Sequence, residues 1–102
     1  MPRWIAIFED NAHALEVREK YREPHFQYLA THASKIRLGG GLQRTPEGPW
    51  VGGLWIIDAD TREEAVQLCK DDPFFVHGLR KGYSLMLWSR APGYGEINTV
   101  PL

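Results

Sequence analysis

The chain has 102 residues, a formal net charge of -1, and 43% hydrophobic and 12% aromatic residues. This length predicts one small domain, this composition excludes a disordered chain, and the scattered Lys and Arg residues exclude the concentrated basic surface of a nucleic-acid-binding protein. No apolar run approaches the ~18 residues of a membrane span, and acidic Glu9 and Asp10 interrupt the apolar stretch that a signal peptide would need. The single cysteine, Cys69, cannot form a disulfide within the chain, which favours a reducing compartment. We therefore expect a cytoplasmic protein with no membrane partner.

Residues 3–9 predict a first strand that is apolar on both of its faces. One face carries Trp4, Ala6 and Phe8, and the other carries Ile5 and Ile7. A helical pattern follows over residues 12–35, and Pro24 within it is expected to bend the helix or to split it in two. Residues 36–44 predict a second strand, and residues 50–59 predict a third strand after a loop rich in Pro and Gly.

A second helix is predicted after Asp60, because Thr61 and Glu64 fit a capping box. Its buried stripe comprises Ala65, Leu68 and Cys69, so the cysteine is interpreted as a core residue. Pro73 is expected to end this helix. Residues 83–90 predict the fourth strand, and residues 91–102 predict an irregular C-terminal tail.

The order strand, helix, strand, strand, helix, strand is typical of an α+β, ferredoxin-like βαββαβ sandwich. This fold has a four-stranded antiparallel sheet with two helices on one face, and we expect it over residues 1–90. Because most of the strands are apolar on both faces, the face without helices would be a large exposed apolar patch. We therefore expect a homodimer that packs sheet to sheet.

A histidine and an arginine share one face of the first predicted helix. Arg22 and His25 lie three residues apart, so their side chains should point the same way, and Pro24 between them favours a site. A histidine can carry a proton in either direction near neutral pH, although His25 can also be a surface or hydrogen-bonded helical residue. Arg22 can bind a substrate anion through its planar fork, or it can form a surface ion pair with Glu19 or Glu23.

A second polar cluster, Asp71-Asp72-Pro73-Phe74-Phe75, lies at the end of the second helix. With right-handed crossovers, we expect both helices to leave parallel central strands and to run side by side in the same direction. His25 and Asp72 would then differ in axial height by only about 5 Å at ~1.5 Å per residue, and could form an acid–base pair. Asp72 can instead simply end the helix, although a carboxylate there faces the unfavourable end of the helix dipole. Phe74 and Phe75 can wall an aromatic pocket or pack in the core.

Three successive glycines, Gly39 to Gly41, interrupt the second strand. They indicate either a twist point with tight packing or space for a ligand. In the second case, backbone amides near Gly40 and Gly41 can stabilise a developing oxyanion. His25 and His32 lie about two helical turns apart, and no cofactor fingerprint is present, so we expect neither a metal ion nor a cofactor.

Three features together resemble the YciI-like (YCII-related) domain family. These are Arg22-x-x-His25 followed by Leu29, the stretch Leu38-Gly39-Gly40-Gly41, and Asp72-Pro73-Phe74 followed by Gly78. The resemblance spans residues 3–90 and implies a dimeric ferredoxin-like fold (a dimeric α+β barrel) with a His/Asp active site, here His25 and Asp72. Relatives include a dehydrochlorinase acting on a chlorinated hydroxyhydroquinone, which implies lyase chemistry on an aromatic substrate. The tail after Arg90, and His77, fall outside the family pattern.

We therefore predict a small cofactor-independent enzyme of the lyase or isomerase type, in which His25 exchanges a proton with a small cyclic or aromatic substrate and Asp72 orients the imidazole. The predicted substrate-binding residues are Arg22, Gly40, Gly41 and Phe74. One alternative is a non-catalytic, small-molecule-binding or accessory dimeric module. Another, which rests on fold analogy alone, is a cofactor-free monooxygenase.

Overall fold

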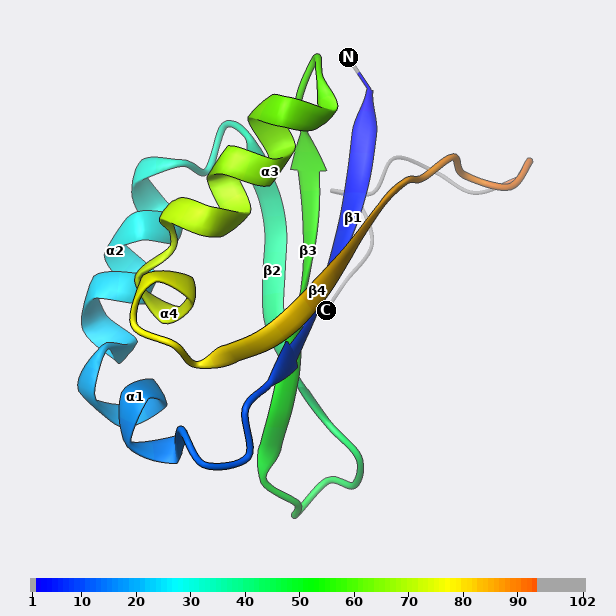
Figure 1. Ribbon diagram of the computed structural model, residues 1–102. Helices are drawn as coiled ribbons and strands as arrows, with labels where there is room; N and C mark the ends of the chain where they lie inside the picture. Colours follow the sequence, from blue (N-terminus) through cyan, green and yellow to red (C-terminus); the bar gives the residue numbers. More distant parts are fainter. Residues whose placement is uncertain (1, 94–102) are drawn as a thin grey trace.

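The computed structural model describes residues 2–93, and within them the chain forms four strands and four helices (Figure 1). In chain order these are β1 (Arg3–Asp10), α1 (Leu15–Lys20), α2 (Arg22–Thr31), β2 (Ile36–Gln43), β3 (Trp50–Asp58), α3 (Arg62–Asp71), α4 (Pro73–Val76) and β4 (Arg80–Leu87). The strands form one sheet in the order β2-β3-β1-β4, and every neighbouring pair is antiparallel. The predicted ferredoxin-like fold is therefore confirmed.

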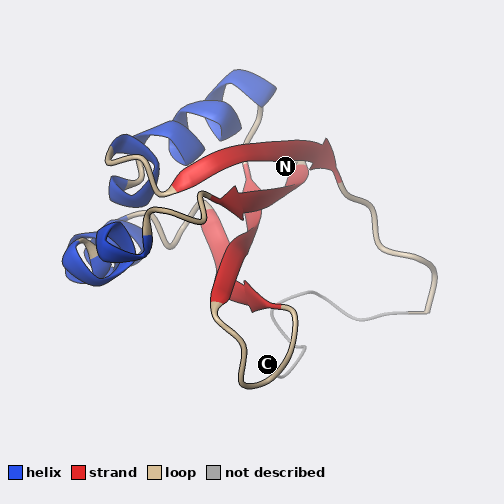
Figure 2. Ribbon diagram, turned by 60° about the horizontal axis from the view of Figure 1, so that its bottom comes forward, coloured by secondary structure: helices blue, strands red, loops and turns tan. Residues whose placement is uncertain are grey.

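The helices cover one face of the sheet and leave its other face without a helix (Figures 1 and 2). The core lies between the two layers, where Trp4, Ala6 and Phe8 of β1 are 8%, 0% and 2% exposed. Ile7, on the opposite face of the same strand, is 38% exposed. The predicted stripe of α3 also packs into this core, and its residues are Ala65, Leu68 and Cys69. The predicted buried stripe of this helix is therefore confirmed.

The helical stretch predicted over residues 12–35 is two shorter helices. α1 ends at Lys20 and α2 begins at Arg22, so the break falls at Tyr21, three residues before Pro24. Pro24 lies in the first turn of α2, where an N–H group would have no helical acceptor and its absence costs little. The helix is therefore split in two as predicted, and the split places Pro24 in the first turn of the second helix, where a proline is tolerated.

Two features near the end of the domain differ from the prediction. A short helix, α4, follows α3 directly, and β4 begins at Arg80 rather than at residue 83. Gly78, with φ 84, makes the turn between them, because glycine adopts this left-handed conformation without strain. The hydrophobic pattern misses the first residues of β4 because they are polar. Arg80 can nevertheless lie in the strand, because it is opposite Asp10 in the ladder and its charge is paired there.

The expectation that both helices leave parallel central strands is wrong. β1 and β3 pair antiparallel, so α2 and α3 run in opposite directions across the sheet (Figure 1). The beginning of α2 consequently lies beside the end of α3. None of the helices between residues 2 and 93 has the length and apolarity needed to cross a bilayer. Most of the predicted tail, residues 94–102, lies outside the described residues.

Candidate active site

His25 and Asp72 meet where the first turn of α2 lies against the end of α3. Nδ1 of His25 is 2.6 Å from Oδ1 of Asp72, and the two residues are 6% and 0% exposed. The predicted proximity of the two side chains is therefore confirmed. The predicted reason for it is wrong, because the helices that bring the pair together are antiparallel rather than parallel.

The backbone at Asp72 explains why its carboxylate points toward the imidazole. Asp72 has an extended conformation, φ -61 and ψ 131, because the Pro73 ring excludes the helical conformation from the preceding residue. Asp72 ends α3 and begins α4, but its side chain makes no capping hydrogen bond to α4. Proline thus accounts for the helix end, and the carboxylate is left to bond to His25.

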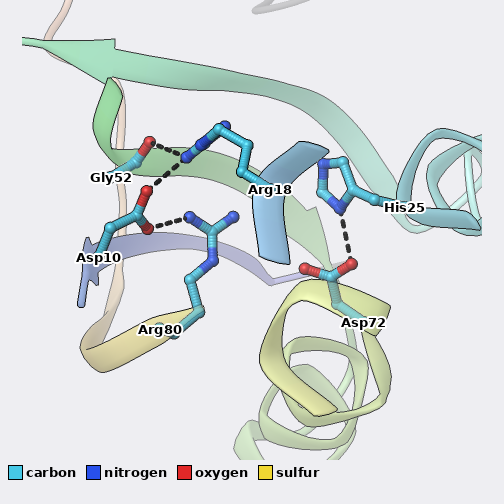
Figure 3. A network of polar contacts seen from close by, with 6 residues as sticks. All are labelled: Asp10, Arg18, His25, Gly52, Asp72 and Arg80. Atoms are coloured by element: carbon cyan, nitrogen blue, oxygen red, sulfur yellow. Dashed lines mark hydrogen bonds and ion pairs between the residues drawn. The ribbon is translucent and has the colours of Figure 1, made fainter. Parts of the chain in front are cut away.

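This hydrogen bond sets the tautomer of the imidazole. A carboxylate accepts, so Nδ1 of His25 donates its proton and Nε2 of the neutral ring carries the lone pair. Figure 3 shows Nε2 pointing away from Asp72, toward the side on which Arg18 lies. The other carboxylate oxygen of Asp72, Oδ2, is buried and has no hydrogen-bond partner within the described chain. The pair is therefore arranged to present a proton acceptor away from the protein interior.

Phe74 stacks on the imidazole of His25 and so fixes the plane of that ring. The Phe74 and His25 rings are stacked, with centroids 3.9 Å apart and an interplanar angle of 11°. Phe74 is 2% exposed, so it is both a core residue and a wall of the site. Phe75 packs elsewhere, against the main core and edge-on to Tyr83, with a centroid distance of 5.5 Å. Only the first phenylalanine of the pair therefore contacts the predicted site.

A cavity of about 510 Å³ opens beside His25. It brings together His25, Arg22, Gly40, Gly41 and Phe74 of the predicted site, while Asp72 lies behind His25. The remaining lining residues are Arg18, Phe26, Leu29, Gly39, Trp50, Gly52, Trp55 and Arg80. The described lining thus combines aromatic rings with three arginines and no acidic residue.

The glycine stretch of β2 gives the tryptophan rings of β3 room to lie against the sheet. A Cβ atom at Gly39 would lie 3.1 Å from Cδ1 of Trp55, and one at Gly41 would lie 2.7 Å from Cε3 of Trp50. A Cβ atom at Gly40, in contrast, would meet no described atom within 4 Å beyond its chain neighbours. Close packing therefore accounts for Gly39 and Gly41, and the rings that they admit form a wall of the cavity.

Sequence reasoning missed a buried charge cluster on the same cavity, formed by Asp10, Arg18 and Arg80. Asp10 accepts from Nη1 of Arg80 at 2.6 Å through Oδ1 and from Nη2 of Arg18 at 2.5 Å through Oδ2 (Figure 3). The three side chains are 6%, 2% and 12% exposed, in the order Asp10, Arg80, Arg18. The sequence could have indicated this cluster through the pairing of Asp10 with Arg80 across β1 and β4, but that pairing can be predicted only if β4 is taken to begin at residue 80.

The neighbouring cysteine is not suited to nucleophilic chemistry. Burial, reinforced by the negative charge of Asp72, raises the pKa of the Cys69 thiol to about 12. A thiol with such a pKa stays protonated near neutral pH, and the thiolate is the nucleophilic form. Burial also raises the pKa of Tyr28, whose hydroxyl donates to the carbonyl of Leu68 at 2.7 Å. His25 is thus the group at this cavity that is best placed to exchange a proton.

Several solved structures share this fold. 5-Chloro-2-hydroxyhydroquinone dehydrochlorinase from Burkholderia phenoliruptrix, in complex with 2,5-dihydroxybenzoquinone, is 24% identical, with a TM-score of 0.79 over 87% of this chain and 95% of that one. A protein from Agrobacterium tumefaciens is 13% identical, with a TM-score of 0.55 over 91% and 96% of the two chains. An antibiotic biosynthesis monooxygenase is 15% identical, with a TM-score of 0.51 over 90% and 100%.

No curated protein matches the chain. The family model for the YCII-related domain, in contrast, matches residues 3–89, which include every element of the fold. This match agrees with the resemblance that the His25, glycine and Asp72 motifs carry in the sequence. The chain belongs to the YCII-related domain family.

Proposed function

We propose that the protein is a small, cofactor-independent enzyme of the lyase or isomerase type, in which His25 is the acid–base group and Asp72 orients it. The observation that carries this proposal is the 2.6 Å contact between Nδ1 of His25 and Oδ1 of the fully buried Asp72 beside a cavity. A carboxylate that fixes the tautomer and stabilises the imidazolium is the usual support for a histidine base. Such general acid–base catalysis is worth about 10²–10⁴-fold in rate.

In an elimination, Nε2 of His25 would take a proton from the substrate. The electron pair of the broken bond to hydrogen forms the new π bond, and a leaving group such as chloride departs with the electron pair of its own bond. Asp72 stabilises the imidazolium produced, and the proton returns to solvent or to the leaving group. In an isomerisation, the same imidazolium would return its proton to another atom of the substrate.

The shape and lining of the cavity support a small planar substrate. Its volume of about 510 Å³ lies in the range of small-molecule sites, and Trp50, Trp55 and Phe26 supply flat apolar surfaces. The similar dehydrochlorinase from Burkholderia phenoliruptrix acts on a chlorinated aromatic compound. We therefore place halogenated or hydroxylated aromatic compounds first among the substrates to test.

The test is turnover of a panel of chlorinated phenols and hydroquinones, followed by chloride release and absorbance. His25→Gln and Asp72→Asn are expected to keep ligand binding and to lose about 10²-fold or more in kcat. His13→Gln is the control, because His13 is exposed and lies outside the cavity. Full turnover in folded His25→Gln would refute the proposal.

The alternative is a binding or accessory module that holds a small molecule without converting it. It would be favoured if the panel bound at the cavity without any turnover. The monooxygenase alternative is supported only by the similarity of this fold to that of the antibiotic biosynthesis monooxygenase. An oxygen electrode separates it from elimination, because elimination consumes no O₂.

We propose in addition that two copies of the chain associate through the sheet face that carries no helix. Ile5 and Ile7 of β1 pair with Ile56 and Leu54 of β3 on this face. Ile7 is 38% exposed and Met86, the β4 partner of Ile5, is 52% exposed. Ile56 is only 5% exposed, but exposed apolar side chains such as those of Ile7 and Met86 on one sheet face are typical of an interface.

Light scattering after gel filtration tests the association directly. Ile7→Lys should shift a dimeric mass toward that of the monomer, because it would bury an ammonium group without a partner. Val76→Lys is the matched control, since Val76 is an exposed apolar residue of α4 in the helical layer. A monomeric wild-type protein, or a dimer unchanged by Ile7→Lys, would contradict this proposal.

A further inference from the structure

The charge cluster of Asp10, Arg18 and Arg80 contains more positive charge than its own members neutralise. Both oxygens of the single carboxylate are occupied, one by each guanidinium. The three side chains are at most 12% exposed, so water compensates the second arginine poorly. A purely structural ion pair would need only one arginine for one aspartate.

The second arginine of the cluster faces the cavity beside His25, and Asp72, the other buried carboxylate that acts on Arg80, lies behind the imidazole. Arg18 and Arg80 both line that cavity, together with the more exposed Arg22, and the described lining contains no acidic residue. Nε of Arg80 is buried without a hydrogen-bond partner in the described chain. In Figure 3, the terminal nitrogen of Arg80 that does not meet Asp10 points to the side of His25 and Asp72. That terminal nitrogen, rather than the buried Nε, is the donor of Arg80 that a ligand in the cavity could reach.

One aromatic ring holds the two arginines and the imidazole around the same space. The guanidinium carbons of Arg18 and Arg80 lie 5.3 and 5.4 Å from the Phe74 centroid, and His25 stacks on that ring at 3.9 Å. Arg80 is also held over Phe8, at 4.6 Å. The cations are thus fixed in position before any ligand arrives, which lowers the entropic cost of binding.

A second cavity of similar size shares Arg18 and Trp50 with the first one but differs in its charged lining. Glu9 and Asp10 line it beside Arg18, Arg44 and Lys81, so carboxylates within that lining offset most of its positive charge. In the cavity that contains His25, the described lining has arginines and no carboxylate.

We infer that this cavity takes its ligand as an anion, namely an aromatic compound carrying an ionised oxygen such as a phenolate, a carboxylate or a hydroxyquinone, with Arg80 and Arg18 as the anion-binding residues. The inference rests on the proposed function only in treating the cavity beside His25 as the substrate site. An arginine fork bonds to such oxygens through two parallel N–H groups. An anionic oxygen held on the arginines would also keep the ring beside Nε2 of His25.

The probe is 2,5-dihydroxybenzoquinone, which is ionised at neutral pH because each hydroxyl is a vinylogous carboxylic acid. Its partner is 2,5-dimethoxybenzoquinone, which has the same ring without an ionisable group. Titration calorimetry at pH 7 should show that the wild-type protein binds the dihydroxy compound about tenfold or more tightly than the dimethoxy compound. Equal affinity for the two quinones would overturn the inference.

Arg80→Met and Arg18→Met should each weaken binding of the dihydroxy compound by about tenfold or more and leave the dimethoxy compound nearly unaffected. Arg62→Met is the control, since Arg62 is exposed on α3 and outside the cavity. If Arg80→Met fails to fold, Arg80→Lys keeps a cation beside Asp10 but loses the planar fork, and it should also weaken binding of the dihydroxy compound. Folded arginine variants that keep the wild-type preference would overturn the inference.

The binding experiments test the anion-binding inference independently of the catalytic role proposed for His25. His25→Gln should keep binding of the dihydroxy compound while turnover is lost. Turnover that persists in His25→Gln, with anion binding still dependent on the arginines, contradicts the catalytic proposal alone. Anion binding that ignores the arginines, with turnover still dependent on His25, contradicts the inference alone.

Discussion

Replacing Phe74 by leucine tests whether the imidazole of His25 is held by the aromatic ring that stacks on it. Phe74 is 2% exposed and stacks on His25 with a centroid distance of 3.9 Å. Leucine would keep most of the apolar volume but cannot stack on the imidazole or interact with the guanidinium groups through a π face. We expect Phe74→Leu to fold, and to let the His25 ring turn away from the orientation that faces the cavity.

The expected loss of stability can be estimated from these contacts. An aromatic pair is worth about 0.5–1.5 kcal/mol, and each cation–π contact at Arg18 and Arg80 about 0.5–1 kcal/mol. Phe74→Leu should therefore lower the free energy of unfolding by about 1.5–3.5 kcal/mol. Phe74→Ala adds a cavity and should cost about 3–5 kcal/mol. Since small domains have about 5–15 kcal/mol in total, the leucine variant is the safer test.

Two measurements on one matched pair distinguish positioning from packing. Phe75→Leu is the control, because Phe75 is the adjacent residue and its ring meets Tyr83 rather than His25. Urea unfolding should report a loss of stability in both variants. Proton–nitrogen NMR of the imidazole should show a weakened or lost Nδ1–H signal of His25 in Phe74→Leu only. An unchanged His25 signal in a folded Phe74→Leu protein would refute the reasoning.

Two further predictions concern the dependence of stability on pH. Because burial raises the pKa of Cys69 to about 12 from 9.0, the unfolded thiol loses its proton at a lower pH than the folded one, and the free energy of unfolding should fall above pH 9 by up to about 1.4 kcal/mol per pH unit. Urea unfolding at pH 7 to 10.5 checks this, and Cys69→Ala should remove that part of the slope. The hydrogen bond from Arg3 lowers the pKa of Asp58 below 3.8, so the stability it contributes is fully present above that value and is lost as the pH falls through the lower, folded value. Asp58→Asn should flatten the acid limb of the unfolding curve, and an unchanged limb would contradict the assignment.

The sequence was sufficient for the fold class because most of its strands and helices, although not the short α4, carried a local signal. A run of branched and aromatic residues marked β1, and Thr61 marked the start of α3, where its side chain accepts from the backbone N–H of Glu64. The start of β4 could not be found in this way, because Arg80 has no apolar pattern and only its tertiary partner Asp10 makes it a strand residue. Local sequence patterns therefore predict that a strand or helix is present, whereas the point at which β4 begins depends on a charge pair with a residue distant in the sequence.

The residues of the candidate site also fall into a group that the sequence could predict and a group that it could not. His25 and Asp72 stood out because each neighbours a proline, and a proline leaves a recognisable mark on a helix pattern. Arg18 and Arg80 lie in ordinary polar positions of α1 and β4, and their importance arises from burial beside a shared aspartate. Burial of a charge is a property of the folded chain, so a search for motifs could not reveal it.

The two parts of the cavity are built differently. The His25–Asp72 pair belongs to the helical layer alone, whereas the charge cluster spans both layers, with Asp10 and Arg80 on neighbouring strands and Arg18 on α1. Phe74 contacts both sets, through stacking on His25 and cation–π interactions with the arginines. Because the sets share no hydrogen bond in the described structure, binding and proton transfer should respond to separate substitutions. Phe74 is the exception, since a change there disturbs the imidazole and the guanidinium groups together.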